Sequence, residues 1–340
     1  MPERLRVLFV DRDPPSGFMA TDRRCLEQQA SLTRIVYPGR PTLRFVASCV
    51  RETLRTDVVY AFFASEHALV PALVARLLRR RFVLVPAGYD YANLPERQYG
   101  LAARGKGWLP RLIGRLATVA LPISRQTMWE FLALVPSAAP RTYLAYLAVD
   151  PEEFRDPGVA RAANTVVTVA HVDEEAWSRK GIDRFVEAAR RDSARRYVLV
   201  GRIAETIEPR LRAMAPSNLD CVGRLSHDDL RRTLWGAAAY VQLSWHETFG
   251  VAMAEAMLCG CVPVITDCPA LHEVAGRWGV SVLPGEDDVE TITRAVAASR
   301  EVDRVAMRRD VAERFSVAAR VGHLGAALGV GAPAMAAGVA

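Results

Sequence analysis

The chain has 340 residues, of which 51% are hydrophobic and 24% are charged. This composition argues against a disordered, collagen-like or coiled-coil protein, and the length predicts two domains that each bury a core. The net charge of +6 is uneven, because residues 1–150 carry +9 and residues 151–340 carry −3. The first half could therefore meet an anionic surface or substrate.

Short apolar runs alternate with segments of helical period along most of the chain. The runs are continuous, which is typical of parallel strands covered on both faces. They occupy residues 5–10, 58–62, 82–85, 119–123, 166–170, 197–200, 240–243, 262–266 and 280–283. Amphipathic stretches lie at 66–80, 125–134, 181–191, 227–236 and 250–258, and a last helical segment follows at about 303–328. The alternation predicts an α/β fold with two doubly wound, Rossmann-like domains.

A segment with two prolines, a glycine and dense charge at 150–164 marks the domain boundary. We expect one domain at 1–155 and a second at 156–309. The helix at about 310–328 is expected to pack back on the first domain, and the tail 329–340 to be frayed.

Neither end of the chain nor its interior predicts export or a membrane span. No stretch approaches the ~20 uninterrupted apolar residues that a spanning helix needs, and the N-terminus does not resemble a signal peptide. The six cysteines have neither zinc-site spacing nor the pattern of a disulfide framework. We therefore expect a soluble, cytoplasmic protein.

The stretch 243–276 carries the strongest chemical signal. A strand ends near Ser244, Glu247 follows in a turn, and Gly250 lets the chain enter a helix whose unpaired N–H groups suit a phosphate. Glu255 lies about 7–8 Å further along that helix, roughly the distance from a diphosphate to its own ribose, whose diol it could bind. Apolar neighbours argue against a pair of solvated glutamates.

This stretch resembles the donor-site signature of retaining GT-B glycosyltransferases of family 4 (glycosyl transferases group 1). The resemblance rests on Glu-x-Phe-Gly, on the seven residues between Glu247 and Glu255, and on the Gly-x-x-Pro-Val-Ile that follows. The resemblance implies two domains facing across a cleft. It implies a hexosyltransferase that moves a sugar from a UDP- or GDP-sugar to an unidentified acceptor with retention. No cofactor and no metal is implied, and the nucleotide-diphosphate sugar is the co-substrate.

The resemblance extends over the second half and assigns the donor site. The family lysine that reaches the diphosphate matches Lys180, one of only two lysines among 44 basic residues, although an ordinary helix lysine is the alternative. An arginine usual after the first donor strand is replaced by His171, and the loop at 221–227 would hold the base through backbone groups. The donor-binding candidates are His171, Arg179, Lys180, Leu225, Glu247, Phe249, Gly250, Val251 and Glu255. Glu247 would bind sugar hydroxyls and Glu255 the ribose.

The first half resembles the family less closely. Gly17 alone stands for a glycine pair, and Asp90 is the best substitute for a histidine that touches the donor sugar, with Tyr89 and Glu96 behind it. A turn aspartate and helix cap is the alternative for Asp90. These four residues are the acceptor-side candidates, and the catalytic candidates are Glu247, Asp90 and Lys180.

The acceptor is expected to be a small molecule, a glycan or a lipid-linked molecule. Basic residues gather with Trp108 in the first half, at Arg76, Arg79, Arg80, Arg81, Arg104, Lys106, Arg111 and Arg115. They could dock on anionic lipid headgroups at the inner membrane face or form a solvated face. Nucleic acid is not expected as a partner, because no known binding motif accompanies the charge.

Two other functions stay open at this point. The missing glycine pair and histidine leave room for a non-catalytic, sugar-nucleotide-binding subunit of a partner transferase. A GT-B nucleotide-sugar epimerase or hydrolase would need no acceptor. A dehydrogenase is disfavoured because no Gly-x-Gly-x-x-Gly fingerprint follows the first strand.

Overall fold

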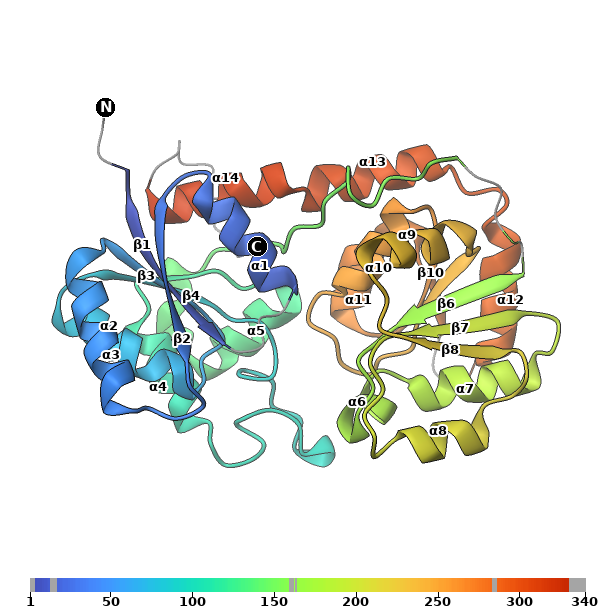
Figure 1. The fold of residues 1–340 in the computed structure, drawn as a ribbon, viewed down its shortest axis with the longest axis horizontal. Helices are drawn as coiled ribbons and strands as arrows, with labels where there is room; N and C mark the ends of the chain where they lie inside the picture. Colours follow the sequence, from blue (N-terminus) through green and yellow to red (C-terminus); the bar gives the residue numbers. More distant parts are fainter. Residues whose placement is uncertain (1–3, 13–16, 159–161, 163, 283–285, 330–340) are drawn as a thin grey trace. The chain divides into compact units, whose positions relative to one another are not determined.

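The computed structural model describes residues 4–12, 17–158, 162, 164–282 and 286–329. The chain divides into two compact units, Met1–Ala148 with Val317–Ala340, and Val149–Ser316. Figure 1 shows the helices and strands of both units. Leu283, predicted to end a strand, and the predicted frayed tail beyond Gly329 lie outside the described residues.

The first unit is built on a parallel sheet with strand order β2-β1-β3-β4-β5. Its strands are β1 (Arg6–Arg12), β2 (Ser31–Tyr37), β3 (Val58–Phe62), β4 (Arg81–Val85) and β5 (Val119–Ala120). Its helices are α1 (Gly17–Glu27), α2 (Leu43–Arg55), α3 (Glu66–Leu77), α4 (Trp108–Leu116), α5 (Arg125–Leu134) and α14 (Val317–Leu328), with 3-10 turns at Pro95–Arg97 and Pro136–Arg141. Because crossovers between parallel strands are right-handed, α2, α3 and α4 cover one face and α1 the other (Figure 1).

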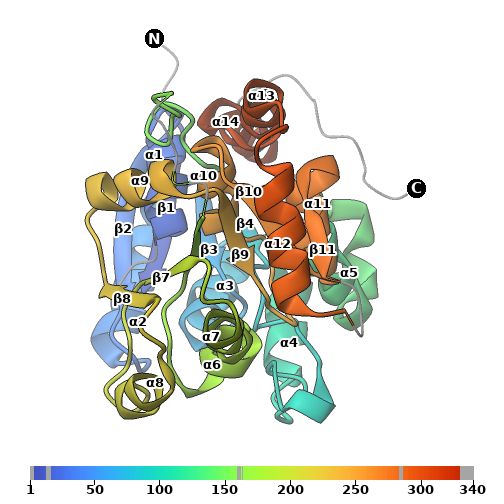
Figure 2. The same cartoon turned by 90° about the vertical axis from the view of Figure 1, so that its right-hand side faces the viewer.

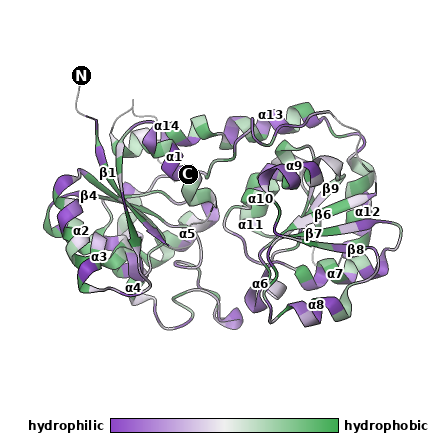
Figure 3. Cartoon of the chain, viewed as in Figure 1, coloured by the Kyte–Doolittle hydropathy of each residue, from purple (hydrophilic) through white to green (hydrophobic). Residues whose placement is uncertain are grey.

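The local chemistry of the first unit explains these elements. β1, β3 and β4 are buried almost throughout, so their sequences are continuous apolar runs. Figure 3 colours the middle of these strands green, whereas the surrounding helices carry both colours. The hydroxyl of Thr42 accepts a hydrogen bond from the N–H of Phe45 at the start of α2, and Ser124 and Thr127 form a capping box before α5.

A buried ion pair attaches α14 to the first unit. The guanidinium of Arg320 donates to both carboxylate oxygens of Asp22 in α1, each at 2.7 Å, and Nη1 donates to the carbonyl of Ala145 at 2.6 Å. The hydroxyl of Tyr60 in β3 donates to the same carboxylate at 2.5 Å. The side chains of Arg320 and Asp22 are no more than 1% exposed. The last described helix is therefore a part of the first unit's core.

The second unit has a parallel sheet with strand order β11-β10-β9-β6-β7-β8. Its strands are β6 (Thr165–Val169), β7 (Arg196–Val200), β8 (Leu219–Gly223), β9 (Ala239–Gln242), β10 (Val262–Thr266) and β11 (Val280–Val282). Its helices are α6 (Glu174–Arg179), α7 (Ile182–Arg191), α8 (Glu208–Met214), α9 (His227–Gly236), α10 (Val251–Leu258), α11 (Pro269–Ala275), α12 (Asp288–Ala298) and α13 (Arg304–Phe315), with a 3-10 turn at Gly276–Trp278. Figures 1 and 2 show α7 and α8 on one side of this sheet and α9 and α10 on the other. The prediction of two doubly wound α/β domains is confirmed.

The units divide at other residues than the sequence predicted. The first ends at Ala148 rather than at 155, and the second continues to Ser316 rather than 309. The single predicted helical segment at 303–328 is wrong, because Ser316 is extended (φ −70°, ψ 162°) and separates α13 from α14. The N–H of Val149 donates to the carbonyl of Phe315 at 2.8 Å, so the two segments that leave the second unit run side by side there.

Within the described ranges, no helix is both long and apolar enough to cross a membrane.

Candidate active site

The end of β9 and the start of α10 form the centre of the candidate site. β9 ends at Gln242, residues 243–250 form a loop, and α10 begins at Val251. β9 lies between β6 and β10, so this loop stands at the carboxyl ends of the central strands, where sheets of this kind bind ligands.

Lys180 reaches this loop because two backbones approach closely. Lys180 is the C-cap of α6, and Gly181 turns the chain into α7 with a left-handed φ of 65°. A Cβ on Gly181 would lie 2.3 Å from the carbonyl oxygen of Leu243, so only glycine permits the approach. The N–H of Trp245 donates to the carbonyl of Arg179 at 3.0 Å and joins the two segments.

Glu247 is held by three polar neighbours. Its Oε2 accepts a hydrogen bond from Nε2 of Gln242 at 2.9 Å and lies 3.6 Å from Nζ of Lys180. Its Oε1 accepts from the N–H of Thr248 at 3.0 Å. Burial by itself raises the pKa of Glu247, but the Lys180 ammonium and the Thr248 N–H outweigh it, so the pKa is lowered. Glu247 is therefore ionised at neutral pH.

The N-terminus of α10 faces the same region. Gly250 precedes the helix with a φ of 91°, a conformation that a side chain would strain. The first N–H groups of a helix have no partner within it, and the helix dipole adds partial positive charge, which suits a phosphate. Val251, the first residue of α10, is partly exposed. The Phe249 ring is in the core, 5.2 Å from the Phe315 ring, so only the Phe249 backbone could meet a donor.

Glu255 has the opposite electrostatic environment to Glu247. Burial raises the pKa of Glu255 to about 8, and the nearby Glu153 carboxylate adds to the shift. Glu153 itself is hydrogen-bonded to Nδ1 of His227 at the start of α9. The two glutamates of the motif are thus an ionised carboxylate and a carboxyl that stays largely protonated near neutral pH, an arrangement that suits different roles.

The other donor-side candidates lie at the edge of this region. Arg179 pairs with Glu175 at 3.1 Å and also helps to lower the pKa of Glu247. His171 is exposed, with Nδ1 3.2 Å from the carbonyl oxygen of Arg202. Leu225 is partly buried in the loop between β8 and α9.

The loop predicted at 221–227 is shorter than expected. β8 continues to Gly223, and His227 already belongs to α9, so only residues 224–226 form the loop. A cavity of about 600 Å³ opens beside it, between β8 and α8, and Cys221, Gly223 and Arg224 are among its lining residues. This hollow adjoins the loop that the sequence predicts to hold a base, and that role stays a prediction.

The acceptor-side candidates lie in the first unit. Gly17 is the exposed first residue of α1, and Glu96 is exposed in the 3-10 turn. The Tyr89 ring packs edge-on against Tyr99 at 5.2 Å, and the Arg104 guanidinium lies 5.5 Å from its centre.

Asp90 is 1% exposed and bonded to backbone. Its Oδ2 accepts from the N–H of Ala64 at 2.8 Å, and its Oδ1 from the N–H of Gly88 at 2.9 Å. Burial raises the pKa of Asp90 to about 6, against the lowering effect of these hydrogen bonds. The geometry favours the turn alternative, in which Asp90 joins the loops after β3 and β4.

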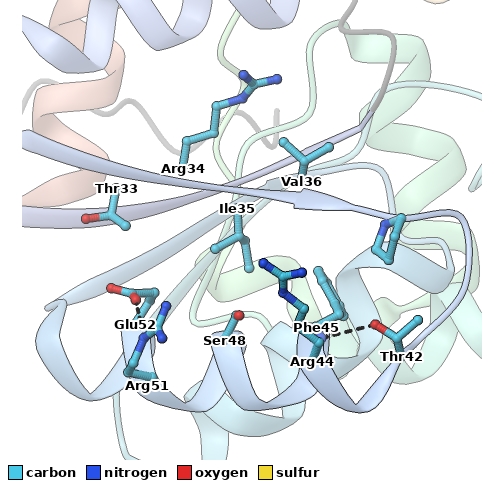
Figure 4. A pocket seen from close by; sticks show the side chains of 11 residues that line it. Thr33, Arg34, Ile35, Val36, Thr42, Arg44, Phe45, Ser48, Arg51 and Glu52 are labelled. Carbon is cyan, nitrogen blue, oxygen red and sulfur yellow. Dashed lines mark hydrogen bonds and ion pairs between the residues drawn. The ribbon is translucent and has the colours of Figure 1, made fainter.

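Among the cavities lined by described residues of the first unit, two lie beside its sheet. One of about 470 Å³ lies between the edge strand β2 and α2, where Figure 4 shows Ile35 pointing toward the helix and Arg34 and Val36 away from it. The other, of about 300 Å³, lies where β1, β2 and β3 end, with Arg12 and Lys106 among its lining residues. Only the second stands at the strand ends that bind ligands in such sheets.

Two polar side chains at the end of β9 were not among the residues predicted for the site. Gln242 is 6% exposed and Ser244 is fully buried. The Oε1 of Gln242 and the Oγ of Ser244 have no hydrogen-bond partner in the part of the chain that the structure describes. A glutamine at the end of the apolar run Ala-Tyr-Val-Gln-Leu was the available signal. The described residues include no cluster of three or more His, Cys, Asp or Glu side chains placed to bind a metal ion.

Residues 163–299 match the family model described as "Glycosyl transferases group 1". This part of the second unit is therefore similar to the domain that group 1 glycosyltransferases share. Two alpha-mannosyltransferases, both described as GDP-mannose:cellobiosyl-diphosphopolyprenol alpha-mannosyltransferase, are relatives of this chain. That of Xanthomonas oryzae pv. oryzae (strain PXO99A) is 33% identical over 128 residues, 36% of this chain and 32% of the relative. That of Xanthomonas campestris is 26% identical over 314 residues, 87% of this chain and 78% of the relative.

Solved structures identify the fold of this chain as GT-B. HepE of Anabaena, in complex with UDP and glucose, superposes with a TM-score of 0.74 at 18% identity, covering 96% of this chain and 99% of HepE. Sucrose-phosphate synthase of Thermosynechococcus elongatus gives 0.74 at 15% identity, covering 95% and 98%. The predictions of a GT-B fold and of a glycosyltransferase enzyme are confirmed.

Proposed function

We propose that the chain transfers a sugar from a nucleoside-diphosphate sugar to an acceptor with retention at the anomeric carbon. The observation that carries the proposal is the meeting of Lys180 and Glu247, 3.6 Å apart, beside the N-terminus of α10. A cation, an ionised carboxylate and a helix N-terminus are the groups that a diphosphate and the hydroxyls of its sugar require.

Each group has a separate role in this proposal. Negative charge develops on the departing diphosphate, and Lys180 with the N–H groups of α10 stabilises it. Glu247 accepts hydrogen bonds from sugar hydroxyls, and Glu255 from the ribose. The leaving phosphate takes the proton of the acceptor, so that no separate protein nucleophile is assigned. These groups stand where a metal ion would otherwise act, and the proposal includes no metal and no cofactor.

The relatives suggest which donor and acceptor to test. The mannosyltransferases are described by GDP-mannose and a cellobiosyl-diphosphopolyprenol, whereas HepE was solved with UDP and glucose. We propose a GDP- or UDP-hexose as donor and a glycan carried on a lipid diphosphate as acceptor. The cavity with Arg12 and Lys106 at the strand ends of the first unit supports an anionic acceptor.

We also propose peripheral contact with an anionic membrane at the cytoplasmic face. α4 exposes Trp108 and Leu112 beside Arg111 and Arg115. Apolar side chains with arginines between them are suited to anionic lipid headgroups. Cosedimentation with vesicles containing anionic lipid, but not with neutral vesicles, is expected, and Trp108→Ala should weaken it. Equal binding to both kinds of vesicle would contradict the charge argument.

Calorimetry and a transfer assay test the proposed reaction. We expect binding of GDP or UDP and of the matching nucleotide sugar, then transfer of labelled sugar to a lipid-diphosphate glycan. The anomeric configuration of the product, read by NMR, should equal that of the donor. An inverted product, or no binding of any nucleotide sugar, would overturn the proposal.

A further inference from the structure

The proposed function gives no role to one buried polar atom of the second unit, Oε1 of Gln242. The residue ends β9, a strand buried along its whole length, and is 6% exposed. Its Nε2 donates to Oε2 of Glu247 at 2.9 Å. Its Oε1 is buried and accepts no hydrogen bond from any residue that the structure describes. Leaving such an acceptor unsatisfied is costly.

The orientation of the amide follows from its neighbour. Glu247 is ionised, with Lys180 beside it, and a carboxylate can only accept hydrogen bonds. The NH2 group of Gln242 must therefore face Glu247. The amide oxygen then necessarily points away from that carboxylate.

The amide oxygen faces the turn that opens α10. A Cβ built on Gly250 would lie 3.7 Å from Oε1 of Gln242 and 3.2 Å from Cδ2 of Leu271. Because Gly250 has no Cβ, it places no side-chain atom in contact with the oxygen, in addition to adopting the left-handed backbone. An acceptor atom here repels phosphate oxygens, which are acceptors too, and requires a ligand that donates a hydrogen bond.

We propose that Gln242 is a donor-binding residue whose amide NH2 orients Glu247 and whose amide oxygen accepts a hydrogen bond from a hydroxyl of the donor sugar. The inference rests on the proposed function, since it needs a nucleotide sugar in this site. Gln242 then has two roles. Its NH2 group orients the Glu247 carboxylate toward one part of the sugar, and its amide oxygen binds a hydroxyl on another part.

The first test compares nucleotides with nucleotide sugars. Kd is measured by calorimetry for GDP, UDP, GDP-mannose and UDP-glucose with wild type, Gln242→Met and the control Thr165→Val. Thr165 is also buried, at the amino end of β6 in the same sheet. Gln242→Met should raise the Kd of the nucleotide sugar by at least about tenfold, as expected for a hydrogen bond to a buried group. It should change the Kd of the free nucleoside diphosphate by less than about threefold. The control should leave both unchanged.

The second test begins with wild type alone, so its first result does not depend on how Gln242→Met folds. Donors lacking one sugar hydroxyl each are compared with the parent nucleotide sugar. One deoxy donor should bind about tenfold more weakly to wild type, and the same deletion should cause no further loss in Gln242→Met.

The outcomes separate the two hypotheses. If wild type binds no nucleotide sugar, the proposed function fails. If wild type binds it but Gln242→Met binds it equally well, or if every deoxy donor binds like the parent, the assignment of Gln242 is overturned and the proposed function stands. An equal loss for nucleoside diphosphate and nucleotide sugar would also overturn it, because Gln242 would then act through folding.

Discussion

Nζ of Lys180 lies 3.6 Å from Oε2 of Glu247, and the two side chains come from different crossover segments of one sheet. Neither charge is left alone in a partly buried place, where an isolated ion is costly. In the proposed site, a diphosphate that approaches Lys180 would therefore compete with Glu247 for the ammonium. Binding of the donor would then weaken the ion pair and leave the Glu247 carboxylate, still bonded to Gln242, available to the sugar.

Removal of Lys180 should act on the diphosphate and not on the nucleoside. Lys180→Ala is expected to weaken nucleoside-diphosphate binding by ~1.5–3 kcal/mol, the value of a hydrogen bond to a charged group, and to leave the bare nucleoside unchanged. Calorimetry at constant ionic strength measures both. Arg190→Ala is the matched control, since it removes an exposed cation paired with Glu187 in the same unit. Equal losses for both ligands would mean that Lys180 supports folding or the base.

Glu255→Ala should weaken nucleotide binding by ~1.5–3 kcal/mol if the carboxylate accepts hydrogen bonds from the ribose. The raised pKa adds a second expectation. Because Glu255 carries a proton up to about pH 8, binding by an ionised carboxylate should release protons near neutral pH. Calorimetry in buffers of different ionisation enthalpy detects that release, and Glu255→Gln should abolish it. Affinity that does not depend on Glu255 would remove it from the ribose site.

Glu255 also predicts a pH dependence of stability. Its folded pKa of about 8 lies above the usual value of 4.5, so the folded state binds more protons between these values. Stability from this group is full below about pH 4.5 and is lost as the pH rises toward 8. Denaturant unfolding of wild type and Glu255→Gln should converge at low pH and diverge in favour of the variant at pH 8. Parallel curves would contradict the shift.

Asp90→Asn should destabilise the first unit. Each carboxylate oxygen accepts a hydrogen bond from a backbone N–H. The NH2 group of an asparagine would face one of these N–H groups, and the lost hydrogen bond costs ~1–3 kcal/mol. Thermal unfolding should report this loss while nucleotide affinity stays unchanged. A stable variant with greatly reduced turnover would instead support the catalytic role that the sequence analysis considered.

Breaking the buried pair of Arg320 and Asp22 should lower the free energy of unfolding more than Asp90→Asn does. Arg320→Met leaves Asp22 as a buried charge without its cation, which costs ~3–5 kcal/mol. The double variant Arg320→Met with Asp22→Leu removes both charges and should recover most of that loss in denaturant unfolding. A double variant no more stable than the single one would show that packing, not charge, dominates at this position.

The central strands and the edge strands β5 and β11 were predictable from the sequence, whereas the edge strands β2 and β8 were not. β3 and β10 are uninterrupted apolar runs because helices cover both faces. β2 and β8 are edge strands, and their polar residues, such as Arg34 and Asp220, hide the strand pattern. The break at Ser316 was also invisible, because it coincides with a contact to Val149, far away in the sequence.

The candidate site was predictable where residues close in sequence define it. Glu247, Gly250 and Glu255 are carried by a single strand-turn-helix segment, so their spacing was informative. Gln242 was missed because its significance depends on which amide atom finds a partner after folding. The burial of Asp90 was missed because its partner Ala64 belongs to the loop after another strand.

The split composition of the first unit has a consequence for biosynthesis. α14 follows the second unit in the chain but supplies Arg320 to the core around Asp22. On the ribosome, residues 149–316 emerge as one continuous unit before α14 does. The second unit can therefore finish folding first. Until α14 emerges, the N-terminal part of the first unit lacks Arg320, the cation that pairs with Asp22. The order in which the two units become complete is the reverse of the order in which they begin to be made.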